Sequence, residues 1–165
     1  MNIVVEGPDG SGKTTLARKI AQYTGLMYEA GRGPEQYPGE IIERARHYMK
    51  LDRRVFDRHP IISQPIYNAY RENSTKIPDD MAEEFYRQRP LLIYCYGSGG
   101  THQIKDYDSP DHLKMIEDFR ERIHMAYHRW AELHVPMEQW YTVHAPADRT
   151  QFILDRCKEY VYNGK

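Results

Sequence analysis

The feature that most constrains the fold lies at the start of the chain, where a short apolar run leads directly into a glycine-rich segment. Residues 2–6 read NIVVE, and residues 7–15 read GPDGSGKTT. Glycines at this spacing, which fits G-x-x-x-x-G-K-[ST], let several backbone N–H groups point at one phosphate. Apolar residues at helical spacing follow and predict a helix over residues 13–23, whose positive N-terminal end faces the same anion. The order strand, glycine loop, helix therefore predicts a phosphate-binding loop.

Both backbone and side chains of this loop are expected to contribute. The residues predicted to bind the phosphates of a nucleoside triphosphate are Gly7, Gly10, Ser11, Gly12, Lys13, Thr14 and Thr15. Lys13 would bridge the outer phosphates as a point charge, and the Thr14 hydroxyl would bind Mg²⁺. The chain has no Asn-Lys-x-Asp segment to read guanine, which argues against a GTPase switch.

Strand-like and helix-like segments alternate along the whole chain. We expect strands over residues 2–6, 26–30, 54–57, 91–96 and 140–143, and helices over 13–23, 40–51, 60–70, 79–88, 110–134 and 148–160. This alternation predicts an α/β fold, in which a five-stranded, mainly parallel sheet is flanked by helices on both faces. Pro65 inside the third helix predicts a kink or a shortened helix. No linker divides the 165 residues, so we expect a single domain over residues 1–165.

Composition limits the partners and the compartment. The net charge is −1, without a basic block, which argues against nucleic acid as a partner. Two cysteines, Cys95 and Cys157, are too few for a disulfide framework and suit a reducing compartment. No window approaches the roughly 20 apolar residues that a membrane span needs. We therefore expect a cytoplasmic protein without a membrane partner.

A second polar segment, DRHPIISQPIY at residues 57–67, begins where the third expected strand ends. The carboxyl ends of parallel strands converge on the ligand in open α/β sheets. Asp57 could hold the shell of Mg²⁺ through water, and Arg58 could clamp a phosphate with two donors. The alternative for this pair is an ordinary surface ion pair. Ser63 and Gln64 could read the edge of a base, or serve only as capping and solvent contacts.

Four segments together resemble the thymidylate kinase family of P-loop nucleoside monophosphate kinases. VVEGPDGSGKTT is similar to the family's EGxDGSGKTT, and DRHPIISQPIY resembles its DRHxxSxQAY, with one residue more between His59 and Ser63. FRERIHMAYHRWAEL at residues 119–133 is similar to the family helix F-x-x-R-V-x-x-x-Y-x-x-L. LLIYC and WYTVHA stand where the family's fourth and fifth strands stand. The resemblance implies a P-loop NTPase fold with ATP as the phosphoryl donor.

The resemblance also implies roles for individual residues. Asp9 would bind the sugar 3′-hydroxyl of an acceptor nucleotide, Arg58 would hold the acceptor's phosphate, and Arg32 would stand for an arginine that follows the family's second strand. The catalytic residues would be Lys13, Arg58 and Asp57, with Thr14 and Asp57 at Mg²⁺. Ser63 and Gln64 would lie against the base, and either Arg44 or Arg46 would add an acceptor contact. The resemblance further implies that the protein forms a homodimer.

One departure from the family concerns the loop expected to close over ATP, residues 97–109. It contains no arginine, whereas family members with a DGSGK loop usually supply arginines from this lid. A cation at the transferred group can change the rate by orders of magnitude. Lys105, Arg120 and Arg122 are the alternatives nearest in sequence.

These observations favour ATP-dependent phosphorylation of a pyrimidine deoxynucleoside monophosphate, such as dTMP or a modified relative. Such an acceptor is already ionised and needs no general base. A deoxynucleoside kinase is the first alternative, because Glu29 stands near the end of the second expected strand, where a base would be required. A kinase acting on DNA ends or modified bases, and a non-catalytic nucleotide-binding protein, are the other two.

Overall fold

The protein is described by a computed structural model that covers residues 1–71, 74–97 and 109–164. Its strands are β1 (Asn2–Glu6), β2 (Met27–Glu29), β3 (Arg54–Asp57), β4 (Leu91–Cys95) and β5 (Trp140–Tyr141). They form one five-stranded sheet in the order β2-β3-β1-β4-β5, and every pairing is parallel. The predicted α/β fold with a five-stranded sheet is thereby confirmed.

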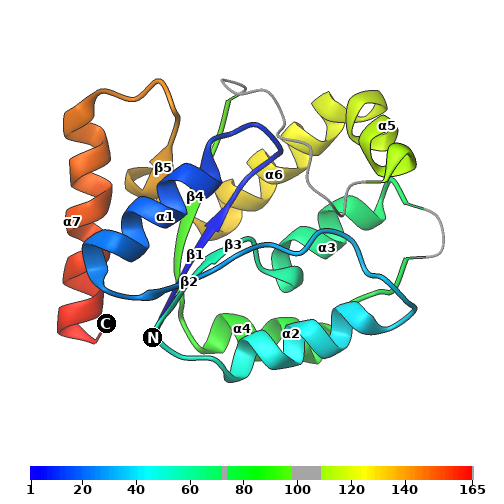
Figure 1. The fold of residues 1–165 in the computed structure, drawn as a ribbon, viewed down its shortest axis with the longest axis horizontal. Helices are drawn as coiled ribbons and strands as arrows, with labels where there is room; N and C mark the ends of the chain where they lie inside the picture. The colour runs from blue at the N-terminus through cyan, green and yellow to red at the C-terminus, as the bar shows by residue number, and fades with distance from the viewer. Residues whose placement is uncertain (72–73, 98–108, 165) are drawn as a thin grey trace.

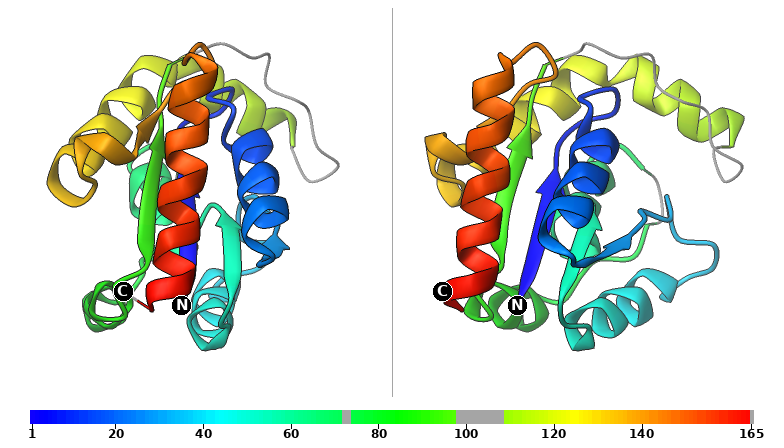
Figure 2. Two further views of the ribbon diagram at one scale, coloured as in Figure 1. Left: turned by 90° about the vertical axis from the view of Figure 1, so that its left-hand side faces the viewer. Right: turned by 60° about the vertical axis from the view of Figure 1, so that its left-hand side comes forward.

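Helices cover both faces of the sheet, as Figures 1 and 2 show. They are α1 (Lys13–Thr24), α2 (Glu40–Lys50), α3 (Pro60–Asn68), α4 (Asp79–Arg87), α5 (Pro110–Asp118), α6 (Arg120–His134) and α7 (Ala147–Asn163), with a short 3-10 turn at Met137–Gln139. Helices α1 and α7 lie on one face, and α2, α3, α4 and α6 lie on the other. In the described ranges, no helix is both long and apolar enough to cross a membrane.

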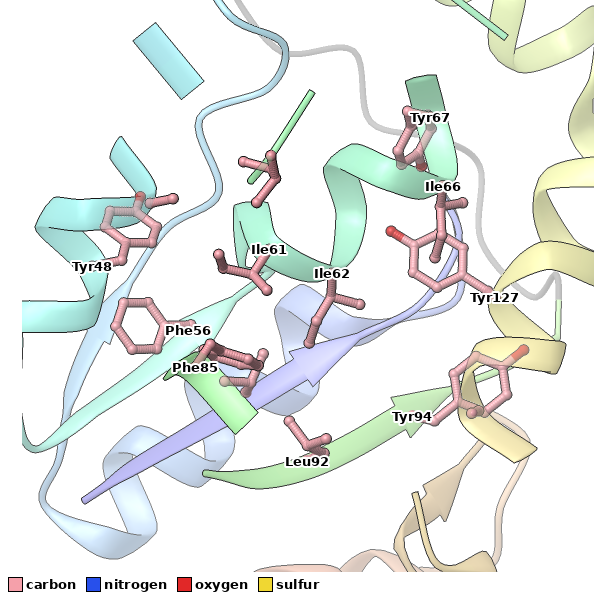
Figure 3. Close-up of a cluster of buried hydrophobic side chains, with 14 of the residues drawn as sticks. Tyr48, Phe56, Ile61, Ile62, Ile66, Tyr67, Phe85, Leu92, Tyr94 and Tyr127 are labelled. Carbon is pink, nitrogen blue, oxygen red and sulfur yellow. The ribbon is translucent and has the colours of Figure 1, made fainter. Parts of the chain in front are cut away.

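The strands divide their side chains between two hydrophobic clusters. On β1, Ile3 and Val5 pack with α1 and α7, while Val4 faces the opposite cluster. That second cluster joins β3 and β4 to the helices of the other face (Figure 3). Because successive side chains of a strand point to opposite faces, a strand covered on both sides is apolar throughout. Every residue of β4 is buried for this reason.

The predicted helix over residues 110–134 is wrong, since the structure has two helices there. Helix α5 ends at Asp118 and α6 begins at Arg120, because the backbone of Phe119 leaves helical geometry at φ −114 and ψ 13. The ring of Phe119 stacks on Tyr70 with 5.0 Å between the ring centres. A tertiary contact that local periodicity does not encode therefore accompanies the break.

Smaller differences occur at the ends of elements. Helix α3 runs through Pro65 and ends at Asn68, two residues earlier than predicted, which agrees with the expected shortening. β5 contains only two residues, whereas α7 extends to Asn163. None of these changes alters the order of the sheet.

The parallel register brings two loops together at one edge of the sheet. Val5 of β1 pairs with Asp57 of β3, so the residues that follow each strand emerge side by side. The backbone N–H of Arg58 continues this pairing by donating to the carbonyl of Val5 at 3.1 Å. The glycine loop therefore faces residues 57–67, which begin with Asp57, Arg58 and His59 and are called the DRH segment below.

Candidate active site

The glycine loop adopts a backbone that only glycine fits at two positions. Gly7 has φ 153 and Gly12 has φ 82. A Cβ on Gly7 would lie 2.1 Å from the carbonyl oxygen of Cys95, and one on Gly12 would lie 1.9 Å from a methyl group of Val143. The loop is therefore folded tightly against β4 and the segment after β5, and it leads directly into the N-terminus of α1.

Lys13 is buried at the first position of α1, with 6% of its surface exposed. Its Nζ donates to the carbonyl of Pro8 at 3.1 Å and lies 3.9 Å from Asp9 Oδ1. Burial, together with the nearby charge of Arg58, lowers the pKa of this ammonium. Ser11, by contrast, has a buried hydroxyl oxygen without a hydrogen-bond partner in the part of the chain that is described. The loop thus holds a desolvated cation and an unsatisfied hydroxyl beside its backbone donors.

The predicted magnesium residues lie together next to this loop. The hydroxyl of Thr14 donates to Asp57 Oδ2 at 2.6 Å, and the hydroxyl of Tyr28 donates to the same oxygen at 3.0 Å. Hydroxyl and carboxylate oxygens fit Mg²⁺, which keeps several ligands as water or substrate phosphate. The described residues contain no group of three or more His, Cys, Asp or Glu side chains that could hold a metal by themselves. Phosphates and water would complete such a site.

Arg58 is held in an uncommon conformation that turns it toward the glycine loop. Its φ of 74 is left-handed, which costs a residue other than glycine about 1 kcal/mol or more. Its guanidinium donates to Asp9 Oδ1 at 2.9 Å and to the carbonyl of Gly7 at 3.3 Å. The hydroxyl of Tyr67 donates to the other oxygen of Asp9 at 2.6 Å. Arg58 therefore pairs with Asp9 across the two loops, and the alternative of a surface pair with Asp57 is wrong.

A pocket opens between the glycine loop, α2, α3 and the start of α5. It encloses about 670 Å³ outside the protein atoms, open solvent included. Its lining residues are Asp9, Lys13, Gly31, Arg32, Gly33, Ile41, Arg44, Tyr48, Asp57, Arg58, Pro60, Ser63, Gln64, Tyr67, Arg71 and His112. All five predicted acceptor residues are among them, and so is Arg44, whereas Arg46 is not.

The two residues predicted to read a base have part of their hydrogen-bonding capacity occupied. Ser63 donates its hydroxyl to the carbonyl of His59 at 3.1 Å. Gln64 donates its amide nitrogen to the carbonyl of Thr75 at 3.2 Å. Ser63 therefore keeps its hydroxyl oxygen as an acceptor, and Gln64 keeps its amide oxygen and a second N–H. Arg32 differs from them, because 61% of its side chain is exposed and it lies 3.8 Å from Glu29.

The sequence offers three basic residues, Lys105, Arg120 and Arg122, in place of the missing lid arginine. Residues 98–108, including Lys105, lie outside the described residues. Arg120 and Arg122 are exposed in the first turn of α6, and neither lines the pocket. Arg71 and His112 do line it, although their isolated positions in the sequence gave no signal.

Glu6 is another residue that the sequence reading did not identify. It is fully buried at the end of β1, where it accepts from the backbone N–H of His59 at 2.6 Å and from the hydroxyl of Tyr127 at 3.2 Å. Burial raises its pKa from 4.5 to about 7, against the opposing charge of Arg58. The sequence signal was an acid at the end of an otherwise apolar strand. Glu6 connects the DRH segment to α6.

The raised pKa of Glu6 predicts a specific dependence of stability on pH. Below pH 4.5 the carboxyl is protonated in both the folded and the unfolded chain, so it does not make the free energy of unfolding depend on pH. As the pH rises to about 7, the unfolded chain loses this proton more readily, so the free energy of unfolding falls by about 3 kcal/mol. Urea unfolding of the wild type and Glu6→Gln at pH 4.5, 6 and 8 would measure it.

Glu6→Gln should remove that part of the pH dependence, since an amide does not titrate in this range. The matched control is Glu121→Gln, which changes an exposed acid on α6. Parallel pH curves for the wild type and Glu6→Gln would show that Glu6 has no raised pKa.

The comparisons with known proteins support the fold. No protein-family model matches the chain, and no curated protein sequence matches it. Among solved structures, the YorR protein of Bacillus subtilis in complex with phosphorylated GDP is similar, with a TM-score of 0.70, 14% identity, and coverage of 99% of this chain and 97% of that one. Two structures of deoxyadenosine kinase from M. mycoides are similar with TM-scores of 0.50 and 0.53 at 18% and 17% identity.

The coverage of these kinase structures is nearly complete in both directions. The structure with the products dCMP and dCDP covers 99% of this chain and 97% of that chain. The structure with bound dATP covers 94% and 98%. The likeness therefore extends over the whole five-stranded fold.

Proposed function

We propose that the protein is an ATP-dependent phosphotransferase that phosphorylates a pyrimidine deoxynucleoside monophosphate, dTMP or a related or modified nucleotide. The observation that best supports this proposal is the pocket beside the glycine loop. Four arginines line this pocket: Arg32, Arg44, Arg58 and Arg71. Guanidinium groups suit an acceptor that carries a charged phosphate, whereas a neutral nucleoside offers no such anion. The two proteins of similar fold also bind nucleotides, phosphorylated GDP in one and the products dCMP and dCDP in the other.

The residues divide the reaction between them as follows. The backbone of the loop and Lys13 would hold the outer phosphates of ATP, and Thr14 and Asp57 would hold Mg²⁺, which neutralises developing charge. Arg58 would orient the acceptor's phosphate, and Asp9 would accept from the sugar 3′-hydroxyl. The acceptor oxygen would attack the γ-phosphoryl group in line, without a general base. Positioning and charge neutralisation would supply most of the rate enhancement.

A product screen tests this proposal. Mg-ATP is incubated with the protein and a panel of nucleosides, nucleoside monophosphates, and DNA with 5′-hydroxyl ends or modified bases, and both ADP and phosphorylated acceptor are measured. A diphosphate formed from a pyrimidine deoxynucleoside monophosphate is the expected product. Phosphorylation of nucleosides alone, or of DNA alone, would overturn the proposal, and no product with any acceptor would favour a non-catalytic nucleotide-binding protein.

A deoxynucleoside kinase is the second candidate, and one observation favours it. Glu29 ends β2, at the same edge of the sheet as Asp57, and a protein of similar fold is a deoxyadenosine kinase. Glu29 nevertheless lies outside the residues that line the pocket and pairs with Arg32. It would have to leave that pair to take a proton from a 5′-hydroxyl.

Glu29→Gln separates the two candidates. A nucleotide kinase should retain its kcat within about twofold, because an ionised phosphate needs no base. Loss of a general base typically costs 10²- to 10⁴-fold. Steady-state kcat with the best acceptor is the measurement, and Glu121→Gln serves as the exposed control. A loss of about 100-fold or more in Glu29→Gln alone would support the nucleoside kinase.

The single domain over residues 1–165, the cytoplasmic location and the homodimer remain part of this proposal. Size-exclusion chromatography with light scattering would measure the oligomeric state.

A further inference from the structure

The four arginines that line the pocket differ in how their charges are balanced. Arg32 lies 3.8 Å from Glu29, Arg58 lies 2.9 Å from Asp9, and Arg44 bonds directly to Glu40. Arg71 has no carboxylate within 4.0 Å among residues 1–71, 74–97 and 109–164. It is therefore the pocket arginine whose charge the described protein leaves unneutralised.

Arg71 is nevertheless held in place by two neighbours. Its Nη2 lies 3.1 Å from Nδ1 of His112 on α5, and its guanidinium carbon lies 4.9 Å from the centre of the Tyr67 ring. Because an arginine can only donate, Nδ1 of His112 accepts, and its proton is on Nε2. His112 is thus neutral in this contact. It fixes the direction of Arg71 without cancelling its charge.

The surroundings make an unneutralised cation costly. Arg71 is partly buried, and burial together with the charge of Arg58 lowers its pKa. Arg58 itself lies 5.1 Å from the same Tyr67 ring. Two cations therefore share one aromatic ring, and only one has a carboxylate partner. A bound anion would relieve this imbalance, since a phosphate bound to a guanidinium gains charge-assisted hydrogen bonds.

The two arginines would respond differently to that anion. Arg58 already pairs with the carboxylate of Asp9, so a phosphate at Arg58 would have to compete with that acid for the positive charge. Arg71 has no such acid in the described part of the chain, and its contact with His112 occupies only one nitrogen of the guanidinium. Preorganised donors without a competing acid bind an anion at lower cost.

We propose that Arg71, oriented by His112 and Tyr67, is the principal binding residue for the 5′-monophosphate of the acceptor nucleotide. Arg58 then keeps its pair with Asp9 and orients the phosphate from the second side. This inference deepens the proposed function and rests on the acceptor being a nucleotide. It assigns the main phosphate contact to a residue outside the DRH segment.

Calorimetric titration with dTMP and with thymidine tests the assignment without requiring turnover. Arg71→Met should weaken dTMP binding by about 10- to 100-fold, the loss expected for hydrogen bonds to a charged group. Thymidine binding should stay unchanged, because thymidine carries no phosphate. Arg71→Lys should restore part of the dTMP affinity. Arg46→Met is the matched control, since Arg46 is exposed on α2 and does not line the pocket.

Three results would overturn the inference. One is an Arg71→Met protein that binds dTMP as tightly as the wild type. Another is an equal loss of dTMP and thymidine affinity, which would show that Arg71 only supports the shape of the pocket. The third is a wild type that binds dTMP no more tightly than thymidine. The product screen separates failure of this inference from failure of the proposed function. If the wild type forms a diphosphate and the Arg71→Met variant is unaffected, only the assignment of the phosphate contact to Arg71 is wrong.

Discussion

Replacing Lys13 with methionine is expected to lower kcat by about 100- to 1000-fold, the range seen when one preorganised donor to a developing charge is removed. Lys13 lies at the N-terminus of α1, where its ammonium would contact the phosphates that change charge during transfer. Methionine keeps most of the side-chain volume but has no donor. Steady-state kinetics with Mg-ATP and the best acceptor would measure this loss.

The same substitution is expected to leave the thermal stability unchanged or to raise it. Lys13 is a desolvated cation close to the charge of Arg58, and its lowered pKa reflects this cost. An apolar side chain would remove both the desolvation and the repulsion, at the loss of the 3.1 Å bond to Pro8 and of the 3.9 Å ion pair with Asp9. Active sites commonly hold groups that function at the expense of stability. A lower melting temperature together with unchanged kcat would contradict both expectations.

Lys19→Met provides the control for this experiment. Lys19 is on the same helix but exposed, so its substitution should change neither kcat nor the melting temperature appreciably. The comparison separates the effect of removing a positive charge from the effect of removing it at the phosphate loop.

The sequence was sufficient for the fold because local signals agreed with the global arrangement. The apolar run before Gly7 and the helical spacing after Lys13 define β1 and α1, and β3 was predicted at its observed bounds, Arg54–Asp57. Parallel register then placed Asp57 beside the end of β1. The proximity of the two polar loops follows from these elements without any long-range information.

The other features of the site depend on contacts between residues far apart in the chain, and the spacing of apolar residues does not encode such contacts. The break at Phe119 accompanies its stacking on Tyr70, a residue from another part of the chain. Arg71 and His112 come within 3.1 Å although they are 41 positions apart in the sequence, and neither belongs to a recognisable pattern. Charge balance among arginines is a property of the folded pocket. It depends on which acid, if any, each guanidinium contacts after folding.

Asp9→Asn is expected to lower the free energy of unfolding by about 3 kcal/mol, the lower end of the cost of breaking a buried ion pair. Asp9 accepts from both Arg58 and Tyr67 and lies 3.9 Å from Lys13, so it is the carboxylate around which these groups gather. An amide retains the shape but removes the negative charge. Arg58 and Lys13 would then repel each other without the carboxylate that lies within 4 Å of both. Urea unfolding measures the change, with Asp118→Asn, an exposed acid on α5, as the control.

Inorganic phosphate should distinguish this electrostatic cause from a general loss of packing. Phosphate in the pocket would supply the charge that Asp9→Asn lacks, so it should raise the melting temperature of the variant by more than that of the wild type. Product formation from the acceptor nucleotide should fall as well, since the amide replaces the group proposed to accept from the sugar 3′-hydroxyl. If phosphate stabilised both proteins equally, or if Asp9→Asn were as stable as the wild type, Asp9 would not be the acid that balances the cations of this pocket. The loop residue would then serve the acceptor alone, and the pairing with Arg58 would contribute little to holding the two loops together.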